Sequence, residues 1–506
     1  MVNPSATATA APPTPAPAKT SFIPPALVPL PPRLFVPIPP SFQRVTDHVP
    51  FGTRVSRGEV LIVNTAGAAH VPLAPADGII TGASEVQLLD GRRVTALHLD
   101  VDPVAPPAPA PESHIASPPP PPPPRAADHG EIRDLPTLIE RLRLAGVWAE
   151  RLTSPDLLGQ LHEAIRRPID TLVCNLLDAD GGSALSAKLV REHGGTIIAG
   201  VSQLARATGA SKVFLAADPR LADRAAVFVR KAGPAGRAVK VVPLANDYPQ
   251  ADPTMLLYAL SGRRLRPDKL PPEVGALVLD AAAAIAVGRA TQTADASAVG
   301  PTIHIADASA VGRAIQATDV SAVGPVTQTE AADASTGPAG DAARAGDPGR
   351  GADPLRGAML TVPIEVRDSA RSRSLVTRAA VGTPLRAVLE ALGLTRPFTL
   401  RAGAALRDVR LSPDAVVAGT ELTVDAGPLA PPINPDPCIR CGWCVENCPV
   451  RINPAGILEA AQENDRGEAE RHGLHACIEC GICSYVCPSR LPLLESVREV
   501  RAGMRG

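Results

Sequence analysis

The stretch CIRCGWCVENCPV, residues 438–450, is followed 26 residues later by CIECGICSYVCPS, residues 477–489. Together the two stretches hold eight of the nine cysteines of this 506-residue chain. Each has the spacing C-x2-C-x2-C-x3-C-P. A short pattern so rich in thiols and repeated once predicts loops that wrap around a metal centre. We therefore expect this part of the chain to form short helices and loops around whatever the thiolates bind.

This spacing is typical of bacterial two-cluster ferredoxins. Three thiolates two residues apart surround one face of an iron–sulfur cube, while the fourth cysteine, on the departing segment, reaches the other cluster. The motifs therefore predict two [4Fe–4S] clusters with crossed ligands. The first cluster is assigned Cys438, Cys441, Cys444 and Cys487, and the second is assigned Cys477, Cys480, Cys483 and Cys448.

Two zinc sites are the alternative interpretation of the cysteines. Structural zinc sites usually pair two separated C-x2-C knuckles, a spacing that differs from the one found here. Gly442 and Gly481 follow the second cysteine of each motif, where a side chain would crowd a cluster. Both observations favour iron–sulfur clusters.

Other candidate ligands have simpler interpretations. Cys174 lies in the apolar run IDTLVCNLL and is expected to be a small buried side chain. His472 and His475 precede the second motif, but four cysteines already serve each cluster, so we expect these histidines to be solvated or to lie behind the ligands. Asp178 and Asp180, in DADGG, are expected to form a loop and not an acid/base pair.

Composition narrows the class of protein. The formal net charge is −1, which argues against nucleic acid or an anionic membrane surface as the main partner. No apolar run reaches 18 residues, and the N-terminal residues have no basic start followed by a compact apolar stretch. The cysteine distribution does not resemble a disulfide framework. A cytosolic chain is expected, with membrane contact through partner subunits.

Shifts in composition divide the chain into seven segments. The first three are a disordered Pro/Ala-rich segment, a small all-β module and a Pro-rich linker with seven consecutive prolines; the next is an α/β core with a mostly parallel sheet. A low-complexity insert with a 12-residue repeat, a small α+β module and the cysteine-rich domain follow. Their ranges are 1–44, 45–103, 104–133, 134–290, 291–357, 358–428 and 429–506.

Four apolar runs in the core are interpreted as buried strands: IDTLVCNLL (169–177), GTIIAGV (195–201), KVFLAAD (212–218) and AVKVVPL (238–244). Helical spacing in SALSAKLVREHG and PRLADRAAVFVRKAG separates them. Apolar strands alternating with helices indicate a parallel sheet covered by helices. The 12-residue repeat is interpreted as a flexible insert, with a short solenoid as the alternative.

The chain resembles the C subunit of the Rnf-type ion-translocating oxidoreductase (electron transport) complex. The resemblance is strongest in PCIRCGWCVENCPV and GLHACIECGICSYVCPSRLPLL, and extends to FGTRVSRGEVLI, DYPQADPTMLLYALSGRRLRPDKLPPEVG and VGTPLRAVLEALG. It implies a multidomain α/β plus β protein. Its parts would be an N-terminal barrel-sandwich (lipoyl-like) module, a Rossmann-like α/β core, a β-grasp module and a C-terminal ferredoxin-like α domain.

The resemblance also implies a function and a place in the cell. It implies a peripheral electron-transfer subunit on the cytoplasmic side of the bacterial inner membrane. This subunit would relay electrons through its two clusters to membrane subunits that couple the flow to ion transport. The electron donor would be NADH, ferredoxin or a flavoprotein. An NADH-oxidising flavoprotein subunit and a scaffold with structural clusters are the alternatives, and whether the chain is itself an enzyme stays open.

Two departures from the family pattern affect its cofactors. The family's flavin loop is rich in glycine, whereas the corresponding LAGVWAERLTSPDLL has only Gly146, and Tyr248-Pro249-Gln250 is followed by ADPT in place of a glycine pair. Phosphate binding needs exposed N–H groups at such a turn, so an FMN site is doubtful. No lysine lies between Phe51 and Asp102, so this module cannot carry lipoate or biotin through a lysine amide.

Overall fold

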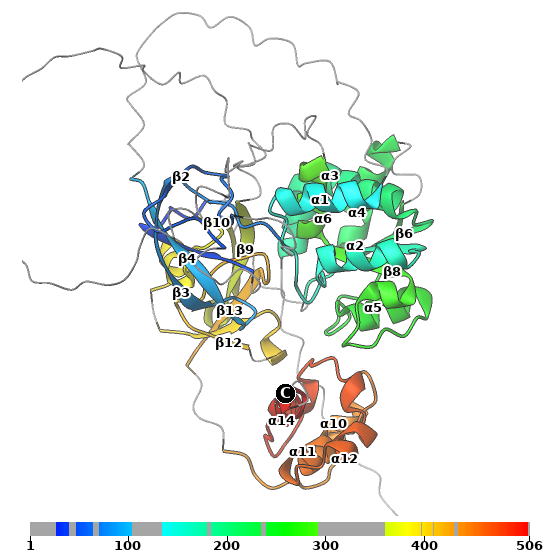
Figure 1. The fold of residues 1–506 in the computed structure, drawn as a ribbon. Coiled ribbons are helices and arrows are strands. Elements are labelled where there is room, and N and C mark those ends of the chain that lie inside the picture. The colour runs from blue at the N-terminus through cyan, green and yellow to red at the C-terminus, as the bar shows by residue number, and fades with distance from the viewer. Residues whose placement is uncertain are drawn as a thin grey trace, which may run out of the picture. The chain divides into compact units, whose positions relative to one another are not determined.

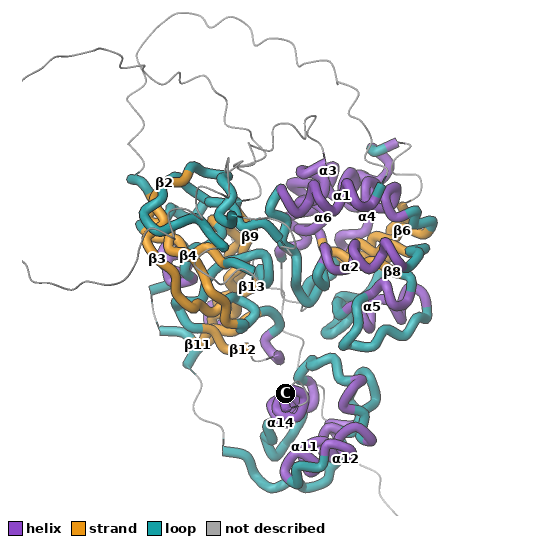
Figure 2. Tube along the Cα trace, viewed as in Figure 1, coloured by secondary structure: helices purple, strands orange, loops and turns teal. Residues whose placement is uncertain are grey.

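The structure is a computed structural model of the 506-residue chain. It describes residues 27–39, 47–63, 70–103, 134–179, 184–233, 239–291, 360–395, 397–407, 409–429 and 434–503. The predicted Pro-rich linker and the repeat insert beyond residue 291 lie outside these ranges, as does most of the predicted disordered N-terminal segment. Three sheets and a helical C-terminal region make up the described residues (Figures 1 and 2).

The N-terminal sheet is antiparallel, in the order β1-β4-β3-β2. Its strands are β1 (Arg33–Pro37), β2 (Arg54–Val55), β3 (Gly78–Gln87) and β4 (Arg93–Val101). Alternate side chains, among them Leu34, Val36, Leu97 and Leu99, lie in one small core. This confirms the β pattern predicted for this region.

One boundary in the predicted organisation is wrong. Residues 33–37 were assigned to the disordered segment, but they form β1 and pair with β4 from Arg33 to Pro37. The reason is the apolar run RLFVP, whose backbone groups would otherwise be buried without partners beside β4. The proline at position 37 is tolerated because β1 is an edge strand.

The core contains a four-stranded parallel sheet in the order β7-β6-β5-β8. The strands are β5 (Thr171–Asn175), β6 (Lys212–Ala217), β7 (Val239–Pro243) and β8 (Ala276–Asp280). The helices of this region are α1 (Leu135–Leu144), α2 (Leu157–Arg166), α3 (Leu185–Thr208), α4 (Pro219–Lys231), α5 (Pro253–Ser261), the 3₁₀ turn η3 (Pro271–Val274) and α6 (Ala281–Thr291). Both β5 and β8 are fully buried, which explains their continuous apolar sequence.

One predicted strand is a helix in the structure. Residues 195–201, GTIIAGV, lie inside α3, which is kinked at His193. Apolar periodicity cannot separate a buried strand from a buried helix, and close packing decides the outcome here. A Cβ on Gly200 would meet the Ala284 carbonyl oxygen at 2.1 Å, and one on Gly288 would meet the Thr196 carbonyl oxygen at 2.4 Å. The small residues therefore bring α3 and α6 into direct backbone contact.

The third sheet is mixed, with five strands in the order β10-β9-β13-β11-β12. Its elements are β9 (Thr361–Asp368), η5 (Ser369–Arg371), β10 (Arg373–Ala380), α9 (Leu385–Ala391), β11 (Thr399–Ala402), η6 (Ala405–Arg407), β12 (Val409–Leu411) and β13 (Thr423–Gly427). Strand β13 runs parallel to β9, while the other pairs are antiparallel. Helix α9 contributes Leu385, Val388 and Leu389 to the core beneath the sheet.

The C-terminal region is made of short helices joined by loops. They are α10 (Trp443–Glu446), α11 (Pro454–Gln462), α12 (Arg466–Arg471), η7 (Leu474–Ala476), α13 (Ile482–Tyr485) and α14 (Leu493–Gly503). Its small core includes Cys448 and Cys477 beside aliphatic residues such as Ile457 and Val497.

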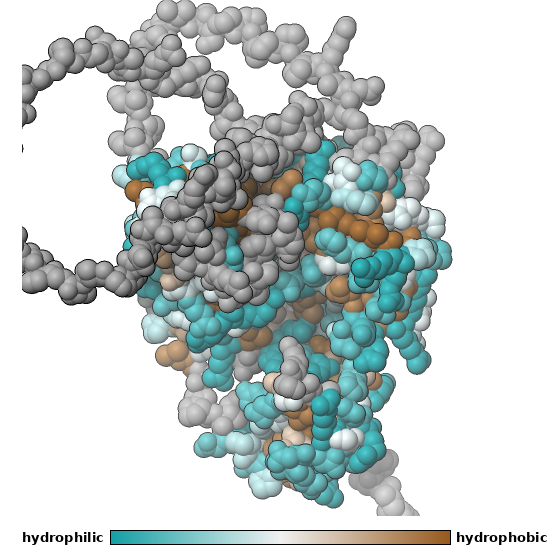
Figure 3. All heavy atoms as spheres, viewed as in Figure 1, coloured by the Kyte–Doolittle hydropathy of each residue, from teal (hydrophilic) through white to brown (hydrophobic). Residues whose placement is uncertain are grey.

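The surface gives no indication of a segment inside a bilayer. Within the described ranges, no helix is long and apolar enough to cross a membrane. In the face shown in Figure 3, hydrophilic side chains predominate over the coloured residues, and apolar side chains form separate patches.

Candidate metal centre

The two cysteine motifs have the same backbone conformation. Left-handed residues occur in each motif at equivalent positions, 39 residues apart: Arg440 and Glu479, Gly442 and Gly481, Arg451 and Arg490. Left-handed backbone in an arginine or a glutamate is uncommon and needs support from its surroundings. Its recurrence in both motifs shows that the repeated sequence folds as a repeated structure.

Hydrogen bonds to sulfur recur with this backbone. The amide of Arg440 donates to Sγ of Cys438 at 3.4 Å, and the amide of Glu479 donates to Sγ of Cys477 at 3.3 Å. The left-handed turn directs each amide at the first thiol of its motif. Such bonds stabilise a thiolate and help to set the potential of a cluster bound to it. The loops therefore fit an iron–sulfur group on an observation of their own geometry.

The four cysteines assigned to the second cluster lie around one cavity. The cavity measures about 350 Å³, and apolar residues from α14 and from the two motifs form the rest of its wall. The cysteines that line it are Cys448, Cys477, Cys480 and Cys483. Three come from the second motif and one from the first.

The first set is nearer the surface. Cys438 and Cys441 are exposed, and Cys444 and Cys487 are half-buried. A pair of hydrogen bonds brings the start of the first motif beside the end of the second. The amide of Asp436 donates to the Ser489 carbonyl at 2.9 Å, and the Ser489 hydroxyl donates to the Pro437 carbonyl at 2.9 Å. Since Ser489 is two residues from Cys487, this contact holds Cys487 near the segment that begins with Cys438.

Burial affects the thiols of the second set most strongly. Desolvation raises the pKa of Cys480 to about 11 and that of Cys483 to about 12, with neighbouring thiols adding to the rise. The pKa of Cys477 is also raised by burial. A thiol must lose its proton to ligate iron, so loading this set releases protons and depends on the metal itself.

Charged residues behind the second motif were missed by the sequence analysis. The carboxylate of Glu479 accepts hydrogen bonds from Arg498 at 3.1 Å and from Arg501 at 2.7 Å. The same Arg501 donates to the carbonyls of Leu474 and Cys477. Helix α14 thus clamps the loop of the second motif. The only available signal was the arginine spacing in VREVRAG, which is common on solvated helices.

The second motif also contacts the rest of the chain. The Tyr248 hydroxyl donates a hydrogen bond to the Cys480 carbonyl, and Arg407 donates to the Ile478 carbonyl at 3.4 Å. A Cβ on Gly481 would lie 1.8 Å from the Leu406 carbonyl oxygen, whereas one on Gly442 would meet nothing within 4 Å. The second set of cysteines therefore faces the chain's own core and its mixed sheet, and the first set does not make the equivalent contacts.

The remaining candidates behave as expected. Cys174 is fully buried in β5, and desolvation raises its pKa far above the usual range. His472 lies 3.1 Å from Glu468, and His475 lies 3.5 Å from Glu470, so both histidines have carboxylate neighbours. In the part of the chain that the structure describes, no three His, Cys, Asp or Glu side chains are close enough to hold a single metal ion.

A ligand crevice in a parallel sheet lies where the strand order reverses, at the carboxyl ends of the strands. Here that place is the end of β5 and β8, and a buried ion pair occupies it. Arg151 donates to both carboxylate oxygens of Asp280 at 2.7 Å, and the Thr153 hydroxyl donates to Asp280 at 2.9 Å. Asp178 and Glu421 line the same small cavity.

These residues do not fit a flavin phosphate. Three carboxylates face one guanidinium, and that guanidinium is already committed to Asp280. Gly146, the only glycine of the predicted flavin loop, ends α1 in a left-handed turn and packs against Leu73. The Asn175 side chain donates to the Ala251 carbonyl and is fully buried. The groups that would bind a phosphate are thus used for packing.

Two families match this architecture. Residues 159–289 match the Nuo51 FMN-binding domain, and residues 430–488 match the 4Fe-4S dicluster domain. The fold and the site therefore define a mixed α/β protein with a ferredoxin-like domain for two [4Fe–4S] clusters. The dicluster match confirms the cofactor predicted from the cysteine spacing.

The resemblance to Rnf-type C subunits is confirmed by known relatives. The chain is 25% identical over 459 residues to the C subunit of an ion-translocating oxidoreductase complex of Pseudomonas aeruginosa, an alignment that covers 87% of this chain and 51% of the relative. It is 24% identical over 306 residues to the C subunit of a Na⁺-translocating ferredoxin:NAD⁺ oxidoreductase complex of Acetobacterium woodii, covering 59% of this chain and 54% of the relative.

The similarity also extends to a protein with another name. The chain is 27% identical over 160 residues to cobalamin reductase PduS of Citrobacter freundii, covering 31% of this chain and 34% of that protein. The chain spans about half the length of the first two relatives.

Proposed function

We propose that this protein is an electron-transfer subunit of a membrane-bound, ion-translocating oxidoreductase complex of the Rnf type. The observation that carries the proposal is the cavity in which Cys448, from the first motif, meets Cys477, Cys480 and Cys483 of the second. It supports ligand sharing between the motifs. Together with the relatives named above, it favours a relay over an isolated binding site.

We assign Cys477, Cys480, Cys483 and Cys448 to one cluster and Cys438, Cys441, Cys444 and Cys487 to the other. When bound, such clusters carry single electrons. The residues of this chain hold them in different surroundings. One set is buried against the core through Tyr248 and Arg407, and the other is partly exposed beside the apolar side chains of Ile439 and Trp443, which are 67% and 52% exposed.

This difference in surroundings supports a division of roles. An exposed apolar group beside a charged rim is a common feature of contact sites for other proteins. We propose that the first set lies next to a partner subunit, while the second set lies next to the chain's own domains. Partners would be the other subunits of the complex, with NADH, ferredoxin or a flavoprotein as the donor, and the location would be the cytoplasmic side of the inner membrane.

The parts of the chain receive names on the same basis. The antiparallel sheet of residues 45–103, extended by β1, has the strand pattern expected of a barrel-sandwich module. The parallel sheet of residues 134–290 is proposed as the Rossmann-like core, and the mixed sheet with α9 in residues 358–428 as a β-grasp module. The remaining boundaries, 1–44, 104–133, 291–357 and 429–506, stay as predicted, apart from the strand at 33–37.

The experiment is anaerobic reconstitution of the full chain, followed by iron and sulfide analysis and an electron paramagnetic resonance redox titration. The proposal predicts about eight irons per chain and two signals that are reduced reversibly. Clusters that cannot be reduced reversibly would support the scaffold alternative instead. Bleaching of a bound flavin by NADH would support the NADH-oxidising alternative.

A further inference from the structure

A large cavity lies apart from the cysteines and from the crevice at β5 and β8. It has a volume of about 1190 Å³, including its open mouth. Residues from all three sheets' regions line it: Val71 and Leu73, Trp148, helix α3, helix α6, and strands β9 and β10. Nothing in the proposed electron-transfer role uses this space.

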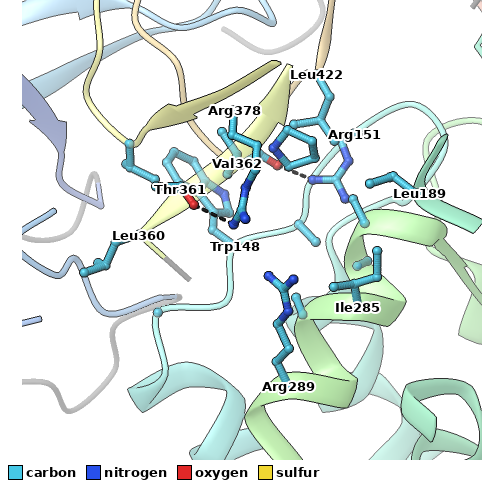
Figure 4. A pocket seen from close by; sticks show the side chains of 18 of the residues that line it. Trp148, Arg151, Leu189, Ile285, Arg289, Leu360, Thr361, Val362, Arg378 and Leu422 are labelled. Carbon is cyan, nitrogen blue, oxygen red and sulfur yellow. Dashed lines mark hydrogen bonds between the residues drawn. The ribbon is translucent and has the colours of Figure 1, made fainter. Parts of the chain in front are cut away.

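Two arginines from distant parts of the sequence reach into the cavity. Arg289 rises from α6, and Arg378 extends from β10 toward the same space (Figure 4). Arg378 donates a hydrogen bond to the Thr361 hydroxyl at 2.7 Å. Among the residues that the structure describes, the Arg289 side chain has no hydrogen bond and no ion pair.

The two arginines repel each other. Burial lowers the pKa of both, and the charge of Arg378 lowers the pKa of Arg289 further. Lys188 also lines the cavity, and its ammonium donates only to the Val376 carbonyl, at 3.2 Å. Glu192 is the one carboxylate in the lining. An excess of positive charge in a half-buried space is costly unless an anion compensates it.

An aromatic wall adjoins this positive charge. The ring of His70 stacks on Trp148, with centroids 4.1 Å apart and an angle of 12° between the planes. His70 is 7% exposed, and its Nε2 has no hydrogen-bond partner among the described residues. Burial lowers its pKa to about 4, so the imidazole is neutral at physiological pH and can donate to or accept from a ligand.

We propose that this cavity binds an organic phosphate with a planar body, of the nucleotide class. Its phosphate would lie between Arg289 and Arg378, because guanidinium groups match phosphate oxygens with paired donors. Its planar body would pack beside Trp148 and the aliphatic lining. The site is separate from the crevice at β5 and β8, where acidic residues prevail.

The test is calorimetric titration of the full chain with four probes: FMN, riboflavin, AMP and inorganic phosphate. FMN and AMP are expected to bind saturably. Riboflavin, which has the ring system of FMN without its phosphate, is expected to bind at least about 10-fold more weakly, as is inorganic phosphate, which lacks the planar body. A clear preference for FMN over AMP, or the reverse, identifies which planar body the cavity accepts.

Variants connect the binding to the arginines. Arg289→Gln and Arg378→Gln should each weaken binding of the preferred probe by about 10-fold to 100-fold, the range for a lost hydrogen bond to a charged group. Arg289→Lys keeps the charge without the paired donors and should fall between wild type and Arg289→Gln. Arg224→Gln, at an exposed arginine of α4, is the matched control and should leave binding unchanged.

A thermal unfolding scan without ligand separates binding from folding. Because Arg289 lacks a partner among the described residues and is repelled by Arg378, Arg289→Gln should not lower the Tm of the ligand-free protein, and only its stabilisation by ligand should be lost. The proposal is overturned if no phosphate-bearing probe binds saturably. It is equally overturned if the Arg289→Gln and Arg378→Gln variants bind the probe as tightly as wild type does.

Discussion

The hydroxyl of Tyr248 donates a hydrogen bond to the backbone carbonyl of Cys480, 232 residues further along the chain. Tyr248 follows β7 at the carboxyl end of the parallel sheet, and Cys480 lines the cavity of the second cysteine set. This contact joins the α/β core to the loop that is proposed to hold a cluster. It gives the two sets of cysteines different surroundings although their sequences are near copies.

The first prediction concerns Tyr248→Phe. The substitution keeps the ring and leaves the Cys480 carbonyl without its partner, so the free energy of unfolding should fall by about 1 kcal/mol. Iron content should stay the same, because no ligand is touched. Thermal unfolding and iron analysis of the reconstituted chain measure both. Tyr258→Phe is the control, since Tyr258 is 53% exposed, and equal losses in the two variants would contradict the prediction.

A second prediction uses the glycines that follow the second cysteine of each motif. Both Gly442→Ala and Gly481→Ala place a Cβ on left-handed backbone, which costs about 1–2 kcal/mol. Only at Gly481 would that Cβ also meet the Leu406 carbonyl, so its total cost should be on the order of 3 kcal/mol. Tm and resistance of the C-terminal domain to limited proteolysis report the difference. Similar behaviour of the two variants would show that Gly481 does not pack against Leu406 in solution.

The third prediction tests the crossed ligands. Cys448→Ser should remove or alter the electron paramagnetic resonance signal of the cluster held by the second motif, and Cys487→Ser should affect the other signal. Cys174→Ala, at a buried cysteine of β5, should leave both signals and the iron content unchanged. If Cys448→Ser instead eliminates the signal that Cys438→Ser eliminates, the crossed assignment is wrong.

The fourth prediction concerns the buried pair Arg151–Asp280. Removing one partner strands a buried charge, so Arg151→Met should cost about 3–5 kcal/mol, and adding Asp280→Leu should restore part of it. Urea denaturation measures both variants. A double variant no more stable than Arg151→Met alone would show that the stranded charge is not the cause.

The same pair predicts a pH dependence. Burial opposes ionisation of Asp280, but attraction to Arg151 and the hydrogen bonds to its carboxylate outweigh burial and lower its pKa below the usual value of 3.8. Its contribution to stability is therefore complete above that value and is lost as the pH falls through the pKa of the folded protein. Urea midpoints measured from about pH 7 down to about pH 3 should converge for wild type and the double variant only at the acidic end.

Some elements could be predicted because their sequence has one physical interpretation. The strands at 171–175, 212–217 and 239–243 are short apolar runs in which buried β structure satisfies every backbone group. The run at 195–201 has the same composition yet is helical, because close packing of α3 on α6 stabilises it there. Local sequence holds no record of that contact.

The sequence by itself determined the cysteine chemistry. Ligand spacing is a local property: three thiols two residues apart can wrap a cluster wherever the loop lies, and the duplicated motif produces a duplicated backbone. Tertiary structure alone decided the rest. It buried one motif against Tyr248 and Leu406 and left the other partly exposed, and it brought Arg289 and Arg378 to one cavity across 89 residues of sequence. Such contacts depend on how whole sheets and helices pack, and no spacing within either segment encodes them.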